Sequence, residues 1–309
     1  MSASVLSERP PSTERGAHRR AVILMIIAPA LWSTAGVVTR HLSPELQADG
    51  RFEITFWRSL FAAVFVGGYL WLQRDFAGTL RRAGAAGLLS GCMWATMFVT
   101  FMLALTLTST ANTLIMLAVA PLMTALLARA VLQAPIRART WMAIFIAMAG
   151  IGAMFAGSLR IESSASVLGM LIALGAPIAS AINVVILKKR GQSVDLVPAV
   201  FLGGVISALA VLPFALPLFA EPRDILLLAL LGFFQLGLPC MLLVIAARHL
   251  LATEVALLAL LEVVLGPLLA WVGAGEVLTR YTLIGGALVI GALLLNELVA
   301  TRPARTEAA

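Results

Sequence analysis

The sequence predicts an all-α integral membrane protein with ten transmembrane helices, arranged as two inverted repeats of five helices. The first observation is composition: 61% of the 309 residues are hydrophobic, 12% are charged, and the mean hydropathy is +1.00. A soluble domain carries about 25% charged residues. The second observation is a series of apolar runs that are long enough to cross a bilayer, because about 20 helical residues span the ~30 Å hydrocarbon core. The third is an internal similarity between the two halves.

The apolar runs define the predicted spans. Ten spans, separated by connections too short to form another domain, lie near residues 21–39, 54–73, 84–106, 110–131, 140–158, 165–187, 197–219, 224–247, 252–272 and 280–299. Residues 1–20 are polar and Arg-containing, and we predict a disordered cytoplasmic tail. A signal peptide is the alternative, but the first run has full spanning length and lacks a small-x-small cleavage site.

The predicted organisation is a tail at residues 1–20, a first repeat at 21–158, a second repeat at 165–299 and a tail at 300–309. If the N-terminus is inside, most Lys and Arg residues fall in the inner connections and tails. Inner loops of membrane proteins carry this excess of positive charge. We therefore expect both termini to be cytoplasmic and the protein to lie in the inner (cytoplasmic) membrane.

The internal similarity is clearest between Ala111–Gln133 and Ala252–Trp271, which align at a constant offset that sets Ala111 opposite Ala252. Pro121 then falls opposite Glu262. Chance similarity between Leu- and Ala-rich segments is the alternative. A repeat of five spans is odd, so the second copy enters the membrane inverted. Inverted repeats are typical of alternating access, with the substrate site near the midplane.

Two motifs carry a resemblance to a known family. They are Ala30–Ser33 (ALWS) near the start of the first span and Leu257–Thr279 (LLALLEVVLGPLLAWVGAGEVLT), which is followed by a Gly-rich last span. The chain resembles the drug/metabolite transporter superfamily, EamA type, over about residues 20–300, and is most similar to the YddG-type amino-acid exporters. The resemblance implies export of small metabolites, commonly amino acids, through a central cavity formed by both repeats.

Few side chains near mid-depth are not aliphatic. Trp32 and Trp94 lie near span centres, where they either pack between helices or line a cavity. Gln235 falls opposite Trp94 in the same alignment of the two halves, and its buried amide needs a partner from a neighbouring helix or a substrate. Asn112 lies toward a span end, where water can satisfy it, and together with Met116 on the same helix it could reach the outer part of a cavity.

Glu262 is the sharpest candidate for binding a substrate ammonium or a coupling proton. A charge at this depth costs about 2.5–3.5 kcal/mol on insertion scales, so it usually faces a cavity or a partner. A structural carboxyl bonded between helices is the alternative. Arg58 lies about a turn inside the outer end of the second span, and we expect it to extend to the interface. A carboxylate-binding role is the alternative, and it would require the side chain to face inward. We expect Asn183 to lie toward a span end, where water satisfies it.

Five prolines interrupt the predicted spans and are candidate hinges or kinks, because each removes a backbone donor and frees a carbonyl. They are Pro29, Pro121, Pro177, Pro239 and Pro267. Small residues cluster on the fifth and tenth spans, among them Gly150 and Gly285, which indicates close helix packing.

These features favour a secondary transporter that exports small neutral metabolites, amino acids in particular. The GxxxxGK[ST], HExxH and GxSxG patterns are absent, and no metal-ligand spacing occurs, so we predict no ATP site, no catalytic residue, no metal and no cofactor. A broad drug or metabolite exporter is one alternative, and a passive channel is another, although a channel would favour a continuous polar stripe. The predicted partners are the small-molecule substrate and lipid, not nucleic acid; the oligomeric state stays open.

Overall fold

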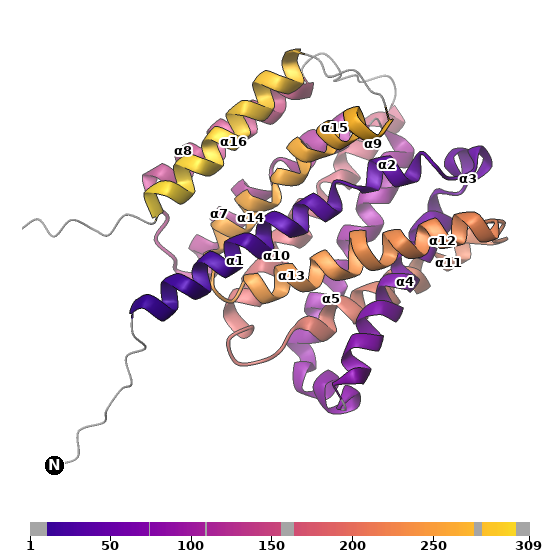
Figure 1. Ribbon diagram of the computed structural model, residues 1–309, viewed down its shortest axis with the longest axis horizontal. Coiled ribbons are helices and arrows are strands. Elements are labelled where there is room, and N and C mark those ends of the chain that lie inside the picture. Colours follow the sequence, from indigo (N-terminus) through magenta and orange to yellow (C-terminus); the bar gives the residue numbers. More distant parts are fainter. Residues whose placement is uncertain (1–10, 74, 109, 156–163, 275–279, 301–309) are drawn as a thin grey trace, which may run out of the picture.

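The computed structural model describes residues 11–73, 75–108, 110–155, 164–274 and 280–300, and all regular structure in these ranges is helical (Figure 1). The elements in chain order are α1 (Pro11–Trp32), α2 (Ala35–Thr39), α3 (Pro44–Asp49), α4 (Arg51–Leu72), α5 (Phe76–Leu107), α6 (Thr110–Leu117), α7 (Ala120–Leu132), α8 (Ala138–Phe155), α9 (Ser164–Ala173), α10 (Gly175–Arg190), α11 (Val197–Ala215), α12 (Pro222–Leu230), the π-helix η1 (Leu231–Gly237), α13 (Leu238–Ala246), α14 (Ala252–Ala259), α15 (Leu261–Ala274) and α16 (Arg280–Ala300).

Nine segments of the described chain are long and apolar enough to cross a membrane, the first being Gly16–Thr39 and the last Ala252–Gly273. They coincide with the first nine predicted spans. The tenth predicted span coincides with α16, whose apolar part, Arg280–Asn296, is shorter than the other nine segments. The count of ten therefore stays a prediction, as does the orientation of the termini.

The first helix starts earlier than expected. α1 begins at Pro11, so the prediction of a disordered segment is wrong for residues 11–20. The helix of the first span is thus extended beyond its apolar part by one polar stretch.

The helices pack side by side over most of their lengths, with α11 against both α4 and α5, and α16 against α8 (Figure 1). The α8–α16 contact depends on glycine. A Cβ on Gly285 would collide with the carbonyl oxygen of Gly150 and with Met154, so the two backbones touch directly. This is the close packing that the small residues of these two spans indicate.

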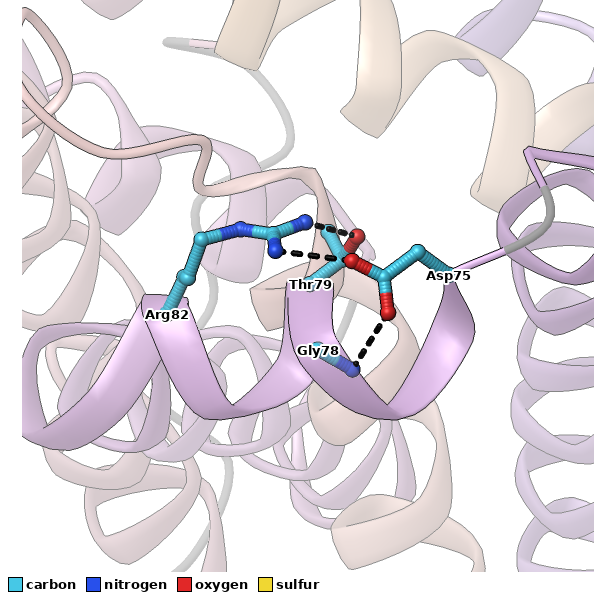
Figure 2. Close-up of polar contacts among 4 residues, drawn as sticks. All are labelled: Asp75, Gly78, Thr79 and Arg82. Carbon is cyan, nitrogen blue, oxygen red and sulfur yellow. Dashed lines mark hydrogen bonds and ion pairs between the residues drawn. The ribbon is translucent and has the colours of Figure 1, made fainter.

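The connection between α4 and α5 is held by an N-cap. The Asp75 carboxylate accepts a hydrogen bond from the Gly78 amide at 3.1 Å and from Arg82 at 2.7 Å, while Arg82 also donates to Thr79 (Figure 2). The hydrogen bond from Arg82 lowers the pKa of Asp75 below its usual value. Shortly after Arg82, Gly84 has φ 52° and ψ −146°, which kinks α5 after this first segment. Residues with a Cβ avoid that conformation.

Candidate functional site

A central cavity lies where helices from both halves of the chain meet. Its walls come from α1, α4, α5, α6, α7, α10, η1, α13, α14 and α15, and its volume is about 190 Å³. One water molecule requires about 10–15 Å³ by this measure, so the cavity can hold a small organic molecule. Most of the wall is apolar, which favours a ligand with a substantial apolar part.

The main polar group of the wall is a hydrogen-bonded chain. The Arg58 guanidinium, on α4, donates from Nη2 to Gln235 Oε1 at 2.7 Å, and the Gln235 amide donates to the Trp32 carbonyl oxygen at 3.3 Å. These three residues belong to α4, η1 and α1. Gly232 allows this approach, because a Cβ there would lie 2.8 Å from the Arg58 carbonyl oxygen. The prediction that Arg58 extends to the interface is wrong: its side chain is buried and lines the cavity.

Glu262 lies on the wall at the start of α15. Its carboxylate is close enough to Arg58 for the two charges to attract, yet no direct ion pair joins them. Its backbone carbonyl accepts a hydrogen bond from Ser33 Oγ at 3.2 Å. Glu262 is thus held by its backbone, while its side chain faces the cavity that Arg58 also faces.

The aromatic side of the cavity is formed by α5. The Trp94 and Phe98 rings lie 5.9 Å apart between centroids, and Met97 and Phe101 line the wall beside them. Trp94 is buried, and within the described chain its indole N–H has no hydrogen-bond partner. This side of the cavity therefore offers flat apolar ring surface, while the indole N–H is buried behind it.

A second buried polar pair also borders the cavity. Ser90 Oγ donates to Asn183 Oδ1 at 2.6 Å, and Asn183 lines the wall. We expected water to satisfy Asn183 near a span end; instead it is buried against α5. The pair links α5 to α10.

Two predicted residues lie elsewhere. Asn112 donates to Thr108 Oγ1 at 2.8 Å, and neither Asn112 nor Met116 belongs to the described wall of the cavity. The helix face explains this: Leu117 lines the cavity, and each residue turns the side chain by about 100°, so Asn112 and Met116 point away from the Leu117 direction. Trp32, Trp94, Gln235 and Glu262 do lie on the wall, and their role in binding stays a prediction.

Four spans are interrupted beside the cavity, at Thr34, Val119, Leu174 and Leu260. These residues have nearly the same backbone conformation, with φ from −73° to −62° and ψ from −20° to −12°. Such ψ values approach those of a 3₁₀ turn, which often marks a hinge. The offset that aligns Ala111–Gln133 with Ala252–Trp271 sets Val119 opposite Leu260. The other two interruptions, at Thr34 and Leu174, lie in the first and sixth spans, which are the corresponding first spans of the two repeats.

The predicted hinge prolines lie close to these interruptions or to η1. Pro121 removes the amide that would bond the Leu117 carbonyl, Pro239 does the same for Gln235, and Pro267 for Val263. Leu117, Gln235 and Val263 all line the cavity, as Pro177 does. Pro29 lies within α1, where Ser33 Oγ bonds its carbonyl at 2.7 Å. Such a back-bond often bends a helix.

A stripe on the second span could have revealed Arg58 from sequence. Thr55, Arg58, Ser59 and Ala62 follow the i, i+3, i+4, i+7 spacing of one helix face, and the first three line the cavity. Among the described residues, no cluster of His, Cys, Asp and Glu could hold a metal ion.

The sequence profile of the EamA-like transporter family matches residues 19–156 and 167–298. The chain belongs to the EamA-like transporter family. A crystal structure of a protein aligns with 93% of this chain and 99% of its own, with a TM-score of 0.78 and 20% identity, which shows a shared fold. No curated protein sequence matches the chain.

The family match confirms the predicted drug/metabolite transporter superfamily of EamA type, with two EamA repeats along the chain. The protein is a multi-pass membrane transporter of this type, and the family's members are transporters rather than enzymes. The similarity to YddG-type exporters, the substrate and the membrane that holds the protein stay predictions.

Proposed function

We propose that this transporter exports small neutral metabolites, amino acids in particular, by alternating access around the central cavity. Aromatic and branched amino acids are included, because Trp94, Phe98 and Phe101 offer apolar surface for such side chains. The described wall carries one arginine and no lysine, so strongly charged phosphorylated sugars lack the cluster of cations that they require.

The observation that carries the proposal is the set of four interruptions, which lie in corresponding spans of the two repeats, the first and sixth and the fourth and ninth, beside one cavity. Discontinuous helices form the midplane sites of transporters built from inverted repeats. We propose that the second repeat is inverted, that both termini are cytoplasmic, and that the protein lies in the inner membrane. The two halves of each broken helix then tilt independently, which opens the cavity to one side at a time.

The test is efflux from proteoliposomes loaded with a mixture of neutral amino acids, with and without a pH gradient. The variant Ala120→Phe places a ring in the cavity, and we expect efflux to be lost. The control Leu171→Phe changes an exposed side chain on α9 and keeps efflux unchanged. External unlabelled amino acid accelerates labelled efflux through a carrier; an unchanged rate indicates a channel and contradicts the proposal.

Glu262→Gln separates two forms of the proposal. Efflux that a pH gradient alters, and that the variant loses, indicates a proton-linked exporter with Glu262 as its switch. Efflux that is changed neither by the pH gradient nor by Glu262→Gln indicates a facilitative carrier in which Glu262 is structural. If no amino acid leaves the vesicles, the amino-acid assignment is wrong, and other metabolites and drugs are tested next.

A further inference from the structure

The position of Arg58 is costly unless an anion joins it. Its side chain is 8% exposed, and a guanidinium carries five N–H donors. Nη2 donates to Gln235 and Nη1 contacts Met102 Sδ at 3.4 Å, while Nε has no partner within the described chain. A neutral amide and a thioether do not compensate a buried positive charge. The donor set of Arg58 is therefore incomplete in this structure.

The nearest candidate partner within the protein is Glu262, and it does not complete the set. Both residues line the cavity, but they form no direct ion pair, and no hydrogen bond between described residues involves the Glu262 carboxylate. Both residues are anchored where they are: Arg58 by Gln235, and Glu262 by the bond from Ser33 to its backbone. The Arg58 guanidinium and the Glu262 carboxylate thus line the same apolar cavity without touching each other.

This charge pattern complements a zwitterion. A ligand with a carboxylate and an ammonium on one carbon can satisfy both groups at once, and the complex stays neutral overall. A carboxylate also fits the planar fork of a guanidinium, which can bind it in a bidentate manner. A purely cationic or anionic ligand leaves either Arg58 or Glu262 unpaired in the apolar wall.

We infer that the cavity is a zwitterion site in which Arg58 binds the carboxylate of an α-amino acid and Glu262 binds its ammonium group. This rests on the proposed function and names the contacts of its substrate. The side chain of the ligand then lies against the rings of Trp94 and Phe98, which line this side of the cavity. Gln235 is a positioning residue, because it holds the guanidinium through Oε1.

The test measures binding to the purified protein by thermal shift and by quenching of tryptophan fluorescence. The probes are phenylalanine, phenethylamine, which lacks the carboxylate, and hydrocinnamate, which lacks the ammonium. We expect phenylalanine to bind on the order of tenfold or more tightly than either analogue, because each loss leaves a buried charge unpaired. Wild-type protein that binds phenethylamine as tightly as phenylalanine overturns the inference. These measurements need no variant.

Variants of Arg58 and Glu262 test which residue binds the carboxylate of the ligand and which binds its ammonium group. Arg58→Gln weakens phenylalanine binding about tenfold or more and leaves phenethylamine binding unchanged. Glu262→Gln weakens phenylalanine binding and leaves hydrocinnamate binding unchanged. Arg58→Lys restores part of the affinity, since it keeps the charge but loses the planar fork. The matched control, Arg223→Gln, removes an exposed arginine on α12. We expect it to leave the affinity for each of the three probes unchanged. Equal weakening of all three probes by Arg58→Gln indicates a structural role and contradicts the inference.

Parallel efflux measurements separate this inference from the proposed function. Phenylalanine that binds with this selectivity but does not cross the membrane supports the zwitterion site and contradicts the exporter. Transport of amines and amino acids at equal rates supports an exporter and contradicts the zwitterion site. No binding of phenylalanine or leucine to the purified protein overturns the inference.

Discussion

Ser33 and Glu262 lie 229 residues apart, and the Ser33 hydroxyl donates to the Glu262 backbone carbonyl at 3.2 Å. Ser33 lies in the interruption between α1 and α2, and Glu262 follows the interruption between α14 and α15. The bond therefore joins two broken helices from opposite halves of the chain beside the cavity. The same O–H also donates to the Pro29 carbonyl at the shorter distance of 2.7 Å, so its single hydrogen is shared between the two carbonyls and links a proline-containing helix to the segment that carries Glu262.

Ser33→Ala should destabilise the protein by about 0.5–1.5 kcal/mol, the usual net value of a hydrogen bond. Thermal unfolding in detergent measures the change. Thr34→Ala is the control, because among the described residues the Thr34 hydroxyl bonds only the Leu31 carbonyl of the preceding helix, α1. A larger loss for Thr34→Ala than for Ser33→Ala would contradict a stabilising role of the contact between the two halves.

Gly285→Ala should destabilise the α8–α16 contact by about 1–3 kcal/mol, since overpacking forces the backbones apart. The added Cβ would collide with the Gly150 carbonyl oxygen and with Met154. Gly291→Ala, on the same helix, meets nothing within 4 Å and should have no such effect. Melting temperatures of the two variants give the comparison, and equal melting temperatures would show that α8 and α16 do not pack this closely.

Gly84→Ala should cost about 1–3 kcal/mol, because its φ of 52° with ψ of −146° excludes a Cβ. The matched control is Gly68→Ala in α4, where nothing lies within 4 Å and the backbone is helical. Alanine is the better helix former, so the control should leave stability unchanged or raise it by up to about 1 kcal/mol. Unfolding curves that shift in the same direction for both variants would refute the kink at Gly84.

Asp75→Asn should be less stable than the wild-type protein at neutral pH, and the difference should disappear in acid. The hydrogen bond from Arg82 lowers the pKa of the folded Asp75 carboxyl. A depressed folded pKa stabilises the protein above the unfolded pKa of about 3.9, and this contribution disappears as the pH falls through the folded pKa. Melting temperatures of both proteins from pH 7 downward give the profile. A difference that persists or grows in acid would show that Arg82 does not act on the charged form.

The sequence predicted the spans well because spanning is a local property: a helix in hydrocarbon needs about 20 apolar residues wherever it lies in the fold. Pro121 and Glu262, which fall opposite each other when the two halves are aligned, also pointed to the two spans that break at Val119 and Leu260. The breaks themselves were not predicted as residues, because a proline fixes its own φ and frees a carbonyl but does not determine which neighbouring residue bends.

The candidate site was predicted less completely. Position near the centre of a predicted span was the basis for selecting four residues that do line the cavity: Trp32, Trp94, Gln235 and Glu262. Depth cannot tell which way a side chain points, so Asn112 and Met116 were expected on the wall and lie off it. The position of Arg58 was missed for the same reason, although the polar stripe on its helix face carried the signal.

By itself, the sequence determined that this is a membrane protein of two related halves with apolar helices and a charged residue at mid-depth. Composition, hydropathy and internal similarity depend only on which residues follow one another along the chain. They do not change when a helix rotates about its axis. Only the tertiary structure decided which polar groups meet: Arg58 with Gln235, Ser90 with Asn183, and Ser33 with the backbone of Glu262. Those pairs depend on the rotation and tilt of each helix against its neighbours, and close packing at glycines such as Gly232 and Gly285 sets both.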